Sequence, residues 1–229
     1  MPSKSSADAA PVADLIRADV EEEILAGRLA PGSKINADEL ARVRGVSHIP
    51  VREALRALEA DGWVVRRHHR GMFVREHDRD EMADLFEARL IVEHQATRLA
   101  AQRRTSDQLA DLDEIVARQA AAEDPAVLAA INAEFHIAMA SCAHNAVLSS
   151  MVTDLNKRVR FFYLPAAEDR RGDSLSEHRA ILAAIRDRRP DDAAELLAEH
   201  IRDTRDDTSR RLGTPAPEPA ASRPAVIAG

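Results

Sequence analysis

The chain has 229 residues, of which 45% are hydrophobic, 3% aromatic and 31% charged, so it can build a sizeable core from helices packed on helices. Its single cysteine excludes an internal disulfide, and no apolar run reaches the roughly 20 residues of a membrane span, so we expect a cytoplasmic protein without membrane partners. The net charge of −7 excludes a uniformly basic surface but not DNA binding, which needs only one positive face.

Both ends of the chain have the composition of disordered segments. Residues 1–11 are rich in Ser, Ala and Pro and lack the apolar stretch of a signal peptide, and residues 213–229 hold four prolines among alanines. Between these ends we distinguish a first domain over residues 12–76 and a second over residues 77–212.

The first domain is predicted to contain three helices followed by a β-hairpin. The helices fall at residues 12–26, 37–44 and 48–60, each followed by a glycine that favours a helix end. Short strands at residues 63–65 and 72–74 flank a basic segment. The second and third helices therefore form a helix-turn-helix over about residues 37–56, and residues 63–75 form a wing beside it.

The start of the third helix carries residue types that suit base edges and phosphates in the major groove. Arg52 can contact guanine through two nitrogens, and Ser47 at the helix N-terminus suits a phosphate. The other candidates on this segment are His48, Ile49 and Pro50. In the wing, the candidates for contacts with the DNA backbone or minor groove are Arg67, His68, His69 and Arg70. The alternative for this basic hairpin is a solvated turn.

This pattern resembles the winged-helix domain of the GntR family. The matching segments are Pro31-Gly32, Asp38-Glu39-Leu40-Ala41, Gly45-Val46-Ser47, Pro50-Val51-Arg52-Glu53-Ala54-Leu55 and Gly71-Met72-Phe73-Val74. The resemblance implies a homodimer on a short palindromic operator of double-stranded DNA, and it adds Asp38 to the DNA-binding candidates. The family usually has arginine at the position of His48 and glycine near His69, so the preferred operator is expected to differ at one base.

The second domain is predicted to be entirely helical. The expected helices cover residues 79–103, 105–121, 125–142, 145–164, 174–188 and 191–211. Thr105 with Gln108, and Ser174 with Glu177, have the spacing of N-terminal capping boxes. The fold class is therefore mainly α, with a winged helix-turn-helix followed by a bundle of about six helices.

Asn132 and three histidines are candidate ligands of a divalent metal in this bundle. Asn132 and His136 share one helix face, and His178 and His200 lie equally far from the turn before Pro190, so they reach the same level of an antiparallel helix pair. Imidazoles at one level suit zinc, nickel or manganese. The alternative is three histidines that are hydrogen-bonded separately.

Residues 79–212 resemble the FCD ligand-binding domain of FadR-type GntR regulators. The matching segments are Phe86–Glu93, Leu99–Ala101, Phe135-His136 with Asn145, Glu177–Leu182 and His200-Ile201. The resemblance implies a four-ligand metal site in which Asn132 replaces the family's usual aspartate, together with an effector carboxylate held by Arg89. The alternative for Arg89 is a surface pair with Glu93. Further effector-binding candidates are Asn145, Arg158 and Arg160.

These features predict a transcriptional repressor whose affinity for DNA is modulated by a small organic acid. One alternative is a metal-dependent enzyme built on the three histidines, but the sequence has no HExxH motif and this function would leave the winged helix without a role. A second alternative is a dimerisation bundle that binds no ligand, which applies if Asn132 abolishes metal binding.

Overall fold

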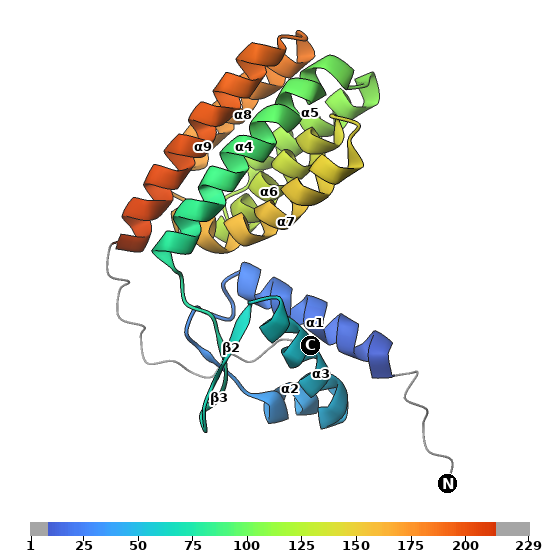
Figure 1. Ribbon diagram of the computed structural model, residues 1–229, viewed down its shortest axis with the longest axis vertical. Helices are drawn as coiled ribbons and strands as arrows, with labels where there is room; N and C mark the ends of the chain where they lie inside the picture. The colour runs from blue at the N-terminus through green and yellow to red at the C-terminus, as the bar shows by residue number, and fades with distance from the viewer. Residues whose placement is uncertain (1–8, 214–229) are drawn as a thin grey trace. The chain divides into compact units, whose positions relative to one another are not determined.

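The computed structural model describes residues 9–213, with side chains from Val12 onward. The chain divides into two compact units between His77 and Asp78 (Figure 1). The disorder expected at the two ends lies mostly outside the described residues. Where they overlap, Ala9–Pro11 form the first turn of a helix that begins earlier than predicted, and Gly213 ends the last helix.

Over residues 9–77, the first unit combines three helices with a small antiparallel sheet (Figure 1). The helices are α1 (Ala9–Leu25), α2 (Ala37–Arg44) and α3 (His48–Ala60). The strands are β1 (Lys34–Ile35), β2 (Val64–Arg67) and β3 (Gly71–Val74), in the order β1-β3-β2. Strand β1 was not predicted, because a two-residue strand is too short for any alternation of polar and apolar residues to be visible.

The three-residue turn between α2 and α3 has the geometry that a helix-turn-helix requires. Gly45 ends α2 with a φ of 63°, a left-handed conformation that favours glycine. Asn36 caps the start of α2 by accepting hydrogen bonds from the backbone N–H groups of Asp38 and Glu39. Ser47 occupies the predicted N-cap position of α3, although its hydroxyl makes no capping hydrogen bond.

Within its described part, residues 78–213, the second unit is a bundle of six α-helices with one short 3₁₀-helix, η1 (Leu164–Ala166). Thr105 and Gln108 form the predicted capping box at the start of α5. The helices are α4 (Arg79–Arg103), α5 (Ser106–Ala121), α6 (Pro125–Ser141), α7 (Ala146–Tyr163), α8 (Arg171–Arg186) and α9 (Pro190–Gly213). The predicted fold class is confirmed, and no helix among residues 9–213 is long and apolar enough to cross a membrane.

The start of α8 corrects one prediction. The helix begins at Arg171 instead of at residue 174, and Ser174 is completely buried inside it. The Ser174 hydroxyl accepts a hydrogen bond from Gln119, and the Glu177 carboxylate accepts from His200 and pairs with Arg170. The capping box predicted for Ser174 and Glu177 is therefore wrong, because contacts with other helices engage both side chains.

Candidate functional site

The start of α3 presents an exposed row of side chains. Ser47, His48, Ile49 and Arg52 are exposed, and Ile49 stands out because 57% of this apolar residue is open to solvent. An exposed apolar side chain beside polar ones suits a major groove, where thymine methyl groups neighbour hydrogen-bonding base edges. His48 Nδ1 lies 3.3 Å from the exposed carboxylate of Asp38 on α2, so the two helices meet at this surface.

Pro50 does not belong to this exposed row. It is buried, together with Val51 and Ala54, on the side of α3 that packs into the first unit. A helix turns 3.6 residues per turn, so a residue directly after three exposed ones can face inward. Pro50 therefore shapes the first turn of α3 and is not available for contact with a base.

The wing carries less free positive charge than its sequence indicates. Arg66 pairs with Glu59 of α3, and Arg67 pairs with Glu76, each at 2.8 Å. Arg67 also lies over the ring of Phe73 at 4.5 Å. Both acids lie outside the hairpin segment, so its local composition did not reveal them.

The tip of the wing carries the three remaining candidates. His68, His69 and Arg70 form the exposed turn between β2 and β3. His69 has a φ of 57°, a left-handed conformation in which glycine is the favoured residue. The two histidines and Arg70 are therefore the side chains that this turn presents to solvent.

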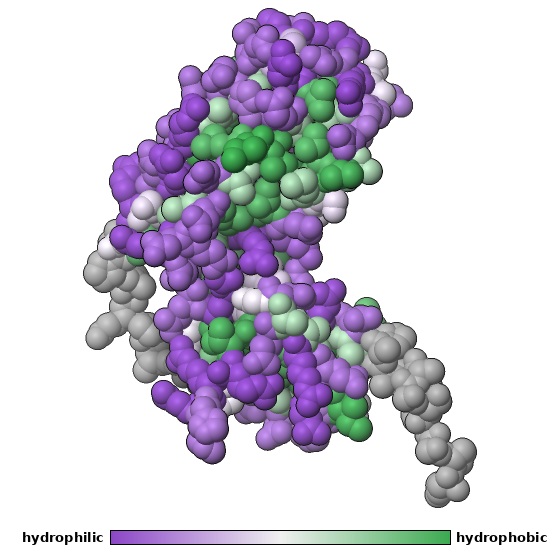
Figure 2. All heavy atoms as spheres, viewed as in Figure 1, coloured by the Kyte–Doolittle hydropathy of each residue, from purple (hydrophilic) through white to green (hydrophobic). Residues whose placement is uncertain are grey.

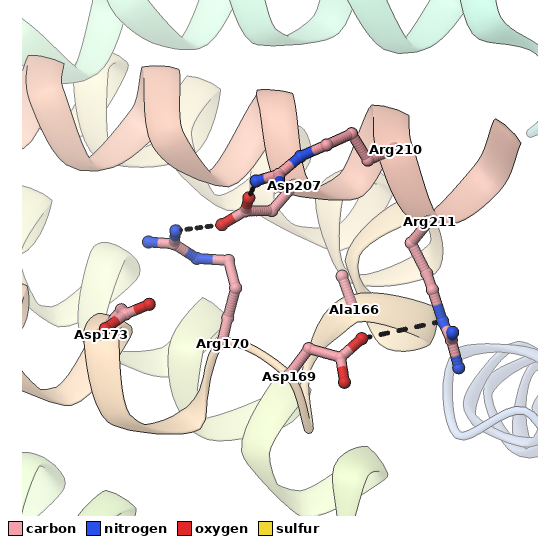
Figure 3. Close-up of a pocket in the computed structure, with 7 residues that line it drawn as sticks. All are labelled: Ala166, Asp169, Arg170, Asp173, Asp207, Arg210 and Arg211. Carbon is pink, nitrogen blue, oxygen red and sulfur yellow. Dashed lines mark hydrogen bonds and ion pairs between the residues drawn. The ribbon is translucent and has the colours of Figure 1, made fainter. Parts of the chain in front are cut away.

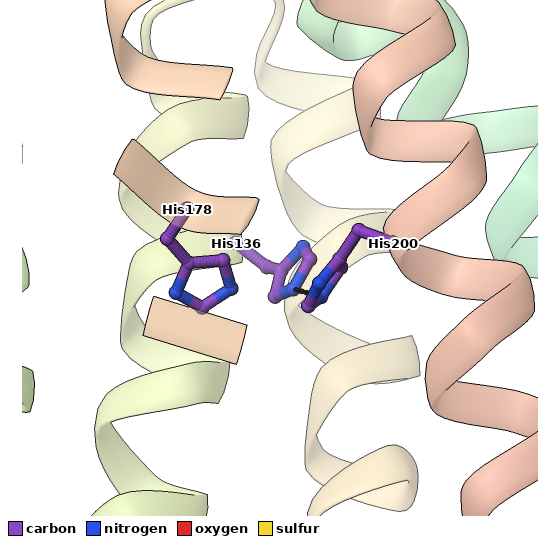
Figure 4. A group of neighbouring side chains, drawn as sticks. All are labelled: His136, His178 and His200. Atoms are coloured by element: carbon purple, nitrogen blue, oxygen red, sulfur yellow. Dashed lines mark hydrogen bonds between the residues drawn. The ribbon is translucent and has the colours of Figure 1, made fainter. Parts of the chain in front are cut away.

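Three histidines from three helices converge inside the second unit (Figure 4). His136 of α6, His178 of α8 and His200 of α9 are all buried, and no more than 1% of any of them is exposed. The Nε2 atoms of His136 and His200 are 3.1 Å apart, and one nitrogen from each of the three rings lies within 4.8 Å of the others.

The Nδ1 atom of each ring lies within 2.7 Å of a side-chain oxygen that can accept a hydrogen bond. Such an acceptor keeps the proton on Nδ1 and leaves a lone pair on Nε2, the arrangement that second-shell groups impose on metal-binding histidines. His178 Nε2 has no hydrogen-bond partner among the described residues. The Nδ1 contacts are His136 with Glu93 at 2.7 Å, His178 with Gln119 at 2.7 Å and His200 with Glu177 at 2.6 Å.

The electrostatics of the cluster favour neutral rings. Burial lowers the pKa of His136 below its usual value, and burial lowers the pKa values of His178 and His200 further still. A neutral imidazole with a free Nε2 lone pair is the form that binds a metal. His136 and His200 contact each other through their Nε2 atoms, but His178 Nε2 and, beyond its contact with Glu93, His136 Nδ1 have no hydrogen-bond partner among the described residues. Separate hydrogen bonding therefore does not satisfy the cluster, and the residues fit a divalent metal.

Asn132 adds a buried oxygen near this cluster. It lies one helical turn before His136 on α6 and is 2% exposed, and its Oδ1 atom has no hydrogen-bond partner among the described residues. A buried amide oxygen without a partner is costly, and a metal ion would satisfy it. Asn132 can therefore supply a neutral fourth ligand.

Arg89 does not lie on the surface, as the alternative of a surface pair with Glu93 required. It is completely buried on α4, although it does pair with Glu93, with Arg89 Nε 2.7 Å from Oε1 of the carboxylate. Burial opposes ionisation of Glu93, but Arg89 and His136 together hold the pKa of its carboxyl well below the usual value. One guanidinium nitrogen, Nη1, has no hydrogen-bond partner among residues 9–213, so this arginine can still donate a hydrogen bond to a ligand.

The other effector-binding candidates lie on α7 or at its start. Asn145 caps α7 by accepting hydrogen bonds from the backbone N–H groups of Val147 and Leu148. Arg158 is exposed and lies 3.4 Å from Glu81 of α4. Arg160 is half-buried on the same helix. Asn145 and Arg158 are thus engaged in contacts that stabilise the bundle.

Three features around the histidines were not predicted from local patterns: Gln119, the acceptor role of Glu177, and Arg170. Arg170 is 3% exposed and bridges Glu177 and Asp207, and it lines a groove of about 370 Å³ (Figure 3). The groove's charges are largely paired with one another, since Asp207 also contacts Arg210 and Asp169 contacts Arg211. No local motif reveals Gln119 or Arg170, because each contacts its partner only after the helices pack.

The fold and these sites define a regulator with a winged-helix DNA-binding unit and a helical ligand-binding unit. Residues 13–74 match the family described as bacterial regulatory proteins, gntR family, and residues 84–203 match the FCD domain. The chain therefore belongs to the GntR family, in the group that carries an FCD domain. Members of this family are DNA-binding transcriptional regulators, which confirms the predicted regulator and lends no support to the metalloenzyme alternative.

Curated relatives and solved structures agree with this assignment. The chain is 31% identical over 173 residues to the Nta operon transcriptional regulator of Aminobacter aminovorans, covering 75% of this chain and 82% of that protein. It is also 31% identical over 193 residues to a probable D-xylose utilization operon transcriptional repressor of Paenarthrobacter nicotinovorans, covering 83% and 85%. The structure of E. coli McbR/YncC has a similar fold, with a TM-score of 0.76 at 22% identity, covering 87% of this chain and 97% of that one.

The depressed histidine pKa values predict a loss of stability in acid. In EDTA, the unfolded chain binds more protons than the folded protein once the pH falls below the ordinary histidine pKa of 6.5. The stability is therefore present above pH 6.5 and declines below it, by up to about 1.4 kcal/mol per histidine per pH unit. Urea unfolding at pH 7.5 and 5.5 measures this, and His178→Gln should reduce the difference. Equal stability at both pH values would contradict the prediction.

Proposed function

We propose that this protein is a ligand-responsive repressor, in which a carboxylate-containing effector and a divalent metal bind inside the helical unit and change the affinity for DNA. The observation that carries the proposal is the convergence of three buried histidine rings, with one nitrogen of each within 4.8 Å of the others, together with the buried Arg89. A relative named as an operon repressor and another named as an operon regulator support control of a neighbouring operon.

The DNA-binding part of the proposal assigns α3 to the major groove. Ser47, His48, Ile49 and Arg52 would meet bases and phosphates there, and Asp38 would orient His48. The wing, with Arg67, His68, His69 and Arg70, would reach the adjacent backbone or minor groove. Effector binding then acts through its different affinity for the DNA-bound and free conformations.

In the ligand-binding part of the proposal, His136, His178, His200 and Asn132 hold zinc, nickel or manganese. The metal, when bound, supplies a positive centre that can coordinate an effector oxygen. Arg89 supplies a second positive charge, with a planar group that matches a carboxylate. Because all four metal ligands are neutral, an anionic effector would offset charge that the protein ligands leave uncompensated.

A homodimer completes the proposal, and an exposed apolar patch supports it. Figure 2 shows apolar side chains gathered on the face of the helical unit that α4 and α7 form. Large apolar patches of this kind commonly mark interfaces. A second copy docked here would pair two winged helices with the two halves of a palindrome. This α4–α7 patch comprises Ile91, Val147 and Met151, which are exposed, and Val92 and Leu148, which are partly buried.

Replacing Arg52 tests the DNA-binding assignment. Arg52→Ala should weaken binding to DNA from upstream of the gene by about 1–3 kcal/mol, because a guanine contact is lost. Fluorescence anisotropy measures this, with Arg98→Ala as a control that removes the same charge from α4 of the helical unit. His48→Arg should alter base preference more than total affinity. If both α3 variants bind like the wild type, this helix face does not read bases.

Replacing Asn132 tests the metal site. Asn132→Asp adds a negative ligand and should raise Ni²⁺ and Zn²⁺ affinity roughly tenfold or more, whereas His178→Ala should lose measurable binding. Isothermal titration calorimetry on EDTA-treated protein gives both values, and His94→Ala on α4 controls for histidines outside the cluster. A wild-type protein that binds neither metal, with no gain in Asn132→Asp, would rule out the site.

Placing a charge in the α4–α7 patch tests the dimer. Met151→Asp buries an unpaired carboxylate in the proposed interface and should convert the dimer to a monomer. Light scattering coupled to size-exclusion chromatography measures the mass. Val127→Asp is the matched control, because Val127 is similarly exposed, at 47%, but lies on α6 outside the patch. An unchanged dimer in Met151→Asp would place the interface elsewhere.

A further inference from the structure

One carboxylate contacts both the effector-binding arginine and a metal-binding histidine. Glu93 Oε1 lies 2.7 Å from Arg89 Nε and 2.9 Å from Asn156 Nδ2, while Oε2 lies 2.7 Å from His136 Nδ1 and 3.4 Å from Arg89 Nη2. All four side chains are completely buried. Glu93 is thus the shared partner of two groups to which we assign different ligands.

The contact with Glu93 restricts what Arg89 can do. An arginine binds a carboxylate best through two parallel N–H donors, and Glu93 already occupies Nε and Nη2. Only Nη1 lacks a hydrogen-bond partner among the described residues. An effector that takes two hydrogen bonds from Arg89 must therefore compete with Glu93 for at least one of them.

Release of Arg89 would strengthen the bond between Glu93 and His136. With the guanidinium withdrawn, the carboxylate keeps His136 and Asn156 as donors, and its charge acts more strongly on the Nδ1 proton. A stronger acceptor at Nδ1 makes Nε2 a better electron-pair donor. Metal binding at Nε2 has the converse effect, since it makes the Nδ1–H a stronger donor and weakens the hold of Glu93 on Arg89.

We propose that Glu93 is the positioning residue through which carboxylate binding at Arg89 and metal binding at His136 enhance each other. The proposal rests on the proposed function, because it takes Arg89 as the effector's counter-ion and the histidines as metal ligands. Linkage requires the two enhancements to be equal in size. Exchange of Arg89 between Glu93 and the effector is the physical event that couples them.

Glu177 provides a matched comparison within the same site. It accepts from His200 Nδ1 at 2.6 Å and pairs with Arg170, so it resembles Glu93 in chemistry. Arg170, however, is also held by Asp207 and lines the groove of Figure 3. Glu177 should therefore orient His200 without exchanging its arginine with an effector bound at Arg89.

The test uses Ni²⁺ and acetate as probes of EDTA-treated full-length protein. In the wild type, saturating acetate should raise Ni²⁺ affinity about tenfold, and saturating Ni²⁺ should raise acetate affinity equally. Glu93→Gln should weaken Ni²⁺ binding about 10- to 100-fold, strengthen acetate binding to metal-free protein and reduce the mutual enhancement well below the wild-type value. Glu177→Gln should weaken Ni²⁺ binding similarly but keep the enhancement and leave metal-free acetate binding unchanged.

Glu93→Gln is expected to weaken Ni²⁺ binding but to strengthen acetate binding. These opposite effects distinguish coupling through Glu93 from a loss of structure, which would weaken both. If Glu93→Gln weakens the binding of both Ni²⁺ and acetate, or if it retains the wild-type mutual enhancement of the two affinities, the inference is wrong. Should Glu93→Gln fail to fold by circular dichroism, Arg89→Met replaces it. This variant should bind Ni²⁺ more tightly than the wild type without acetate, and unchanged or weaker Ni²⁺ binding would overturn the inference.

A different result would overturn the proposed function. If Ni²⁺-loaded wild type does not bind acetate, or if Arg89→Met binds it as the wild type does, the carboxylate site at Arg89 is wrong. The two failures are distinguishable. The proposed site is decided by whether the Ni²⁺-loaded wild type binds acetate and whether Arg89→Met loses that binding, whereas the inference is decided by the mutual enhancement and by how Glu93→Gln changes the two affinities.

Discussion

The helical unit depends on how it satisfies one ionised carboxylate in its interior. Glu93 is completely buried, and an isolated charge there would cost several kcal/mol. Its partners come from three helices: Arg89 from its own α4, His136 from α6 and Asn156 from α7. Because each partner must be correctly placed to offset this cost, the relative positions of α4, α6 and α7 are specified by polar contacts as well as by packing.

The two units use polar residues in opposite ways. In the winged helix, the residues proposed to read DNA remain exposed on α3 and the wing tip, where hydration must be exchanged for contacts with a long polyanion. In the helical unit, the residues proposed to bind ligands are buried, where low dielectric strengthens charge interactions and excludes competing water. The first arrangement suits a large partner, and the second suits a small one.

Local patterns were sufficient for most of the helices and for bringing the three histidines of the bundle together. Glycine positions and apolar spacing located α2, α3 and their turn, and the equal distance of His178 and His200 from Arg189 indicated that they meet. Predictions failed where a side chain could form a hydrogen bond or ion pair either within its own segment or with a distant part of the chain. Ser174 and Glu177 fit a capping box by spacing, yet both bond to other helices, and the arginines of the wing find acids outside their hairpin.

The sequence by itself determined the class of protein. Residue types at fixed spacing are enough to identify a helix-turn-helix with a wing and a bundle that carries histidines. Only the tertiary structure decided how the buried groups pair. It assigned Nδ1 of each histidine to Glu93, Gln119 or Glu177, and it buried Arg89 with one nitrogen lacking a hydrogen-bond partner among residues 9–213. The reason is physical: hydrogen bonds act over about 3 Å, and these partners lie 23 to 59 residues apart in the chain.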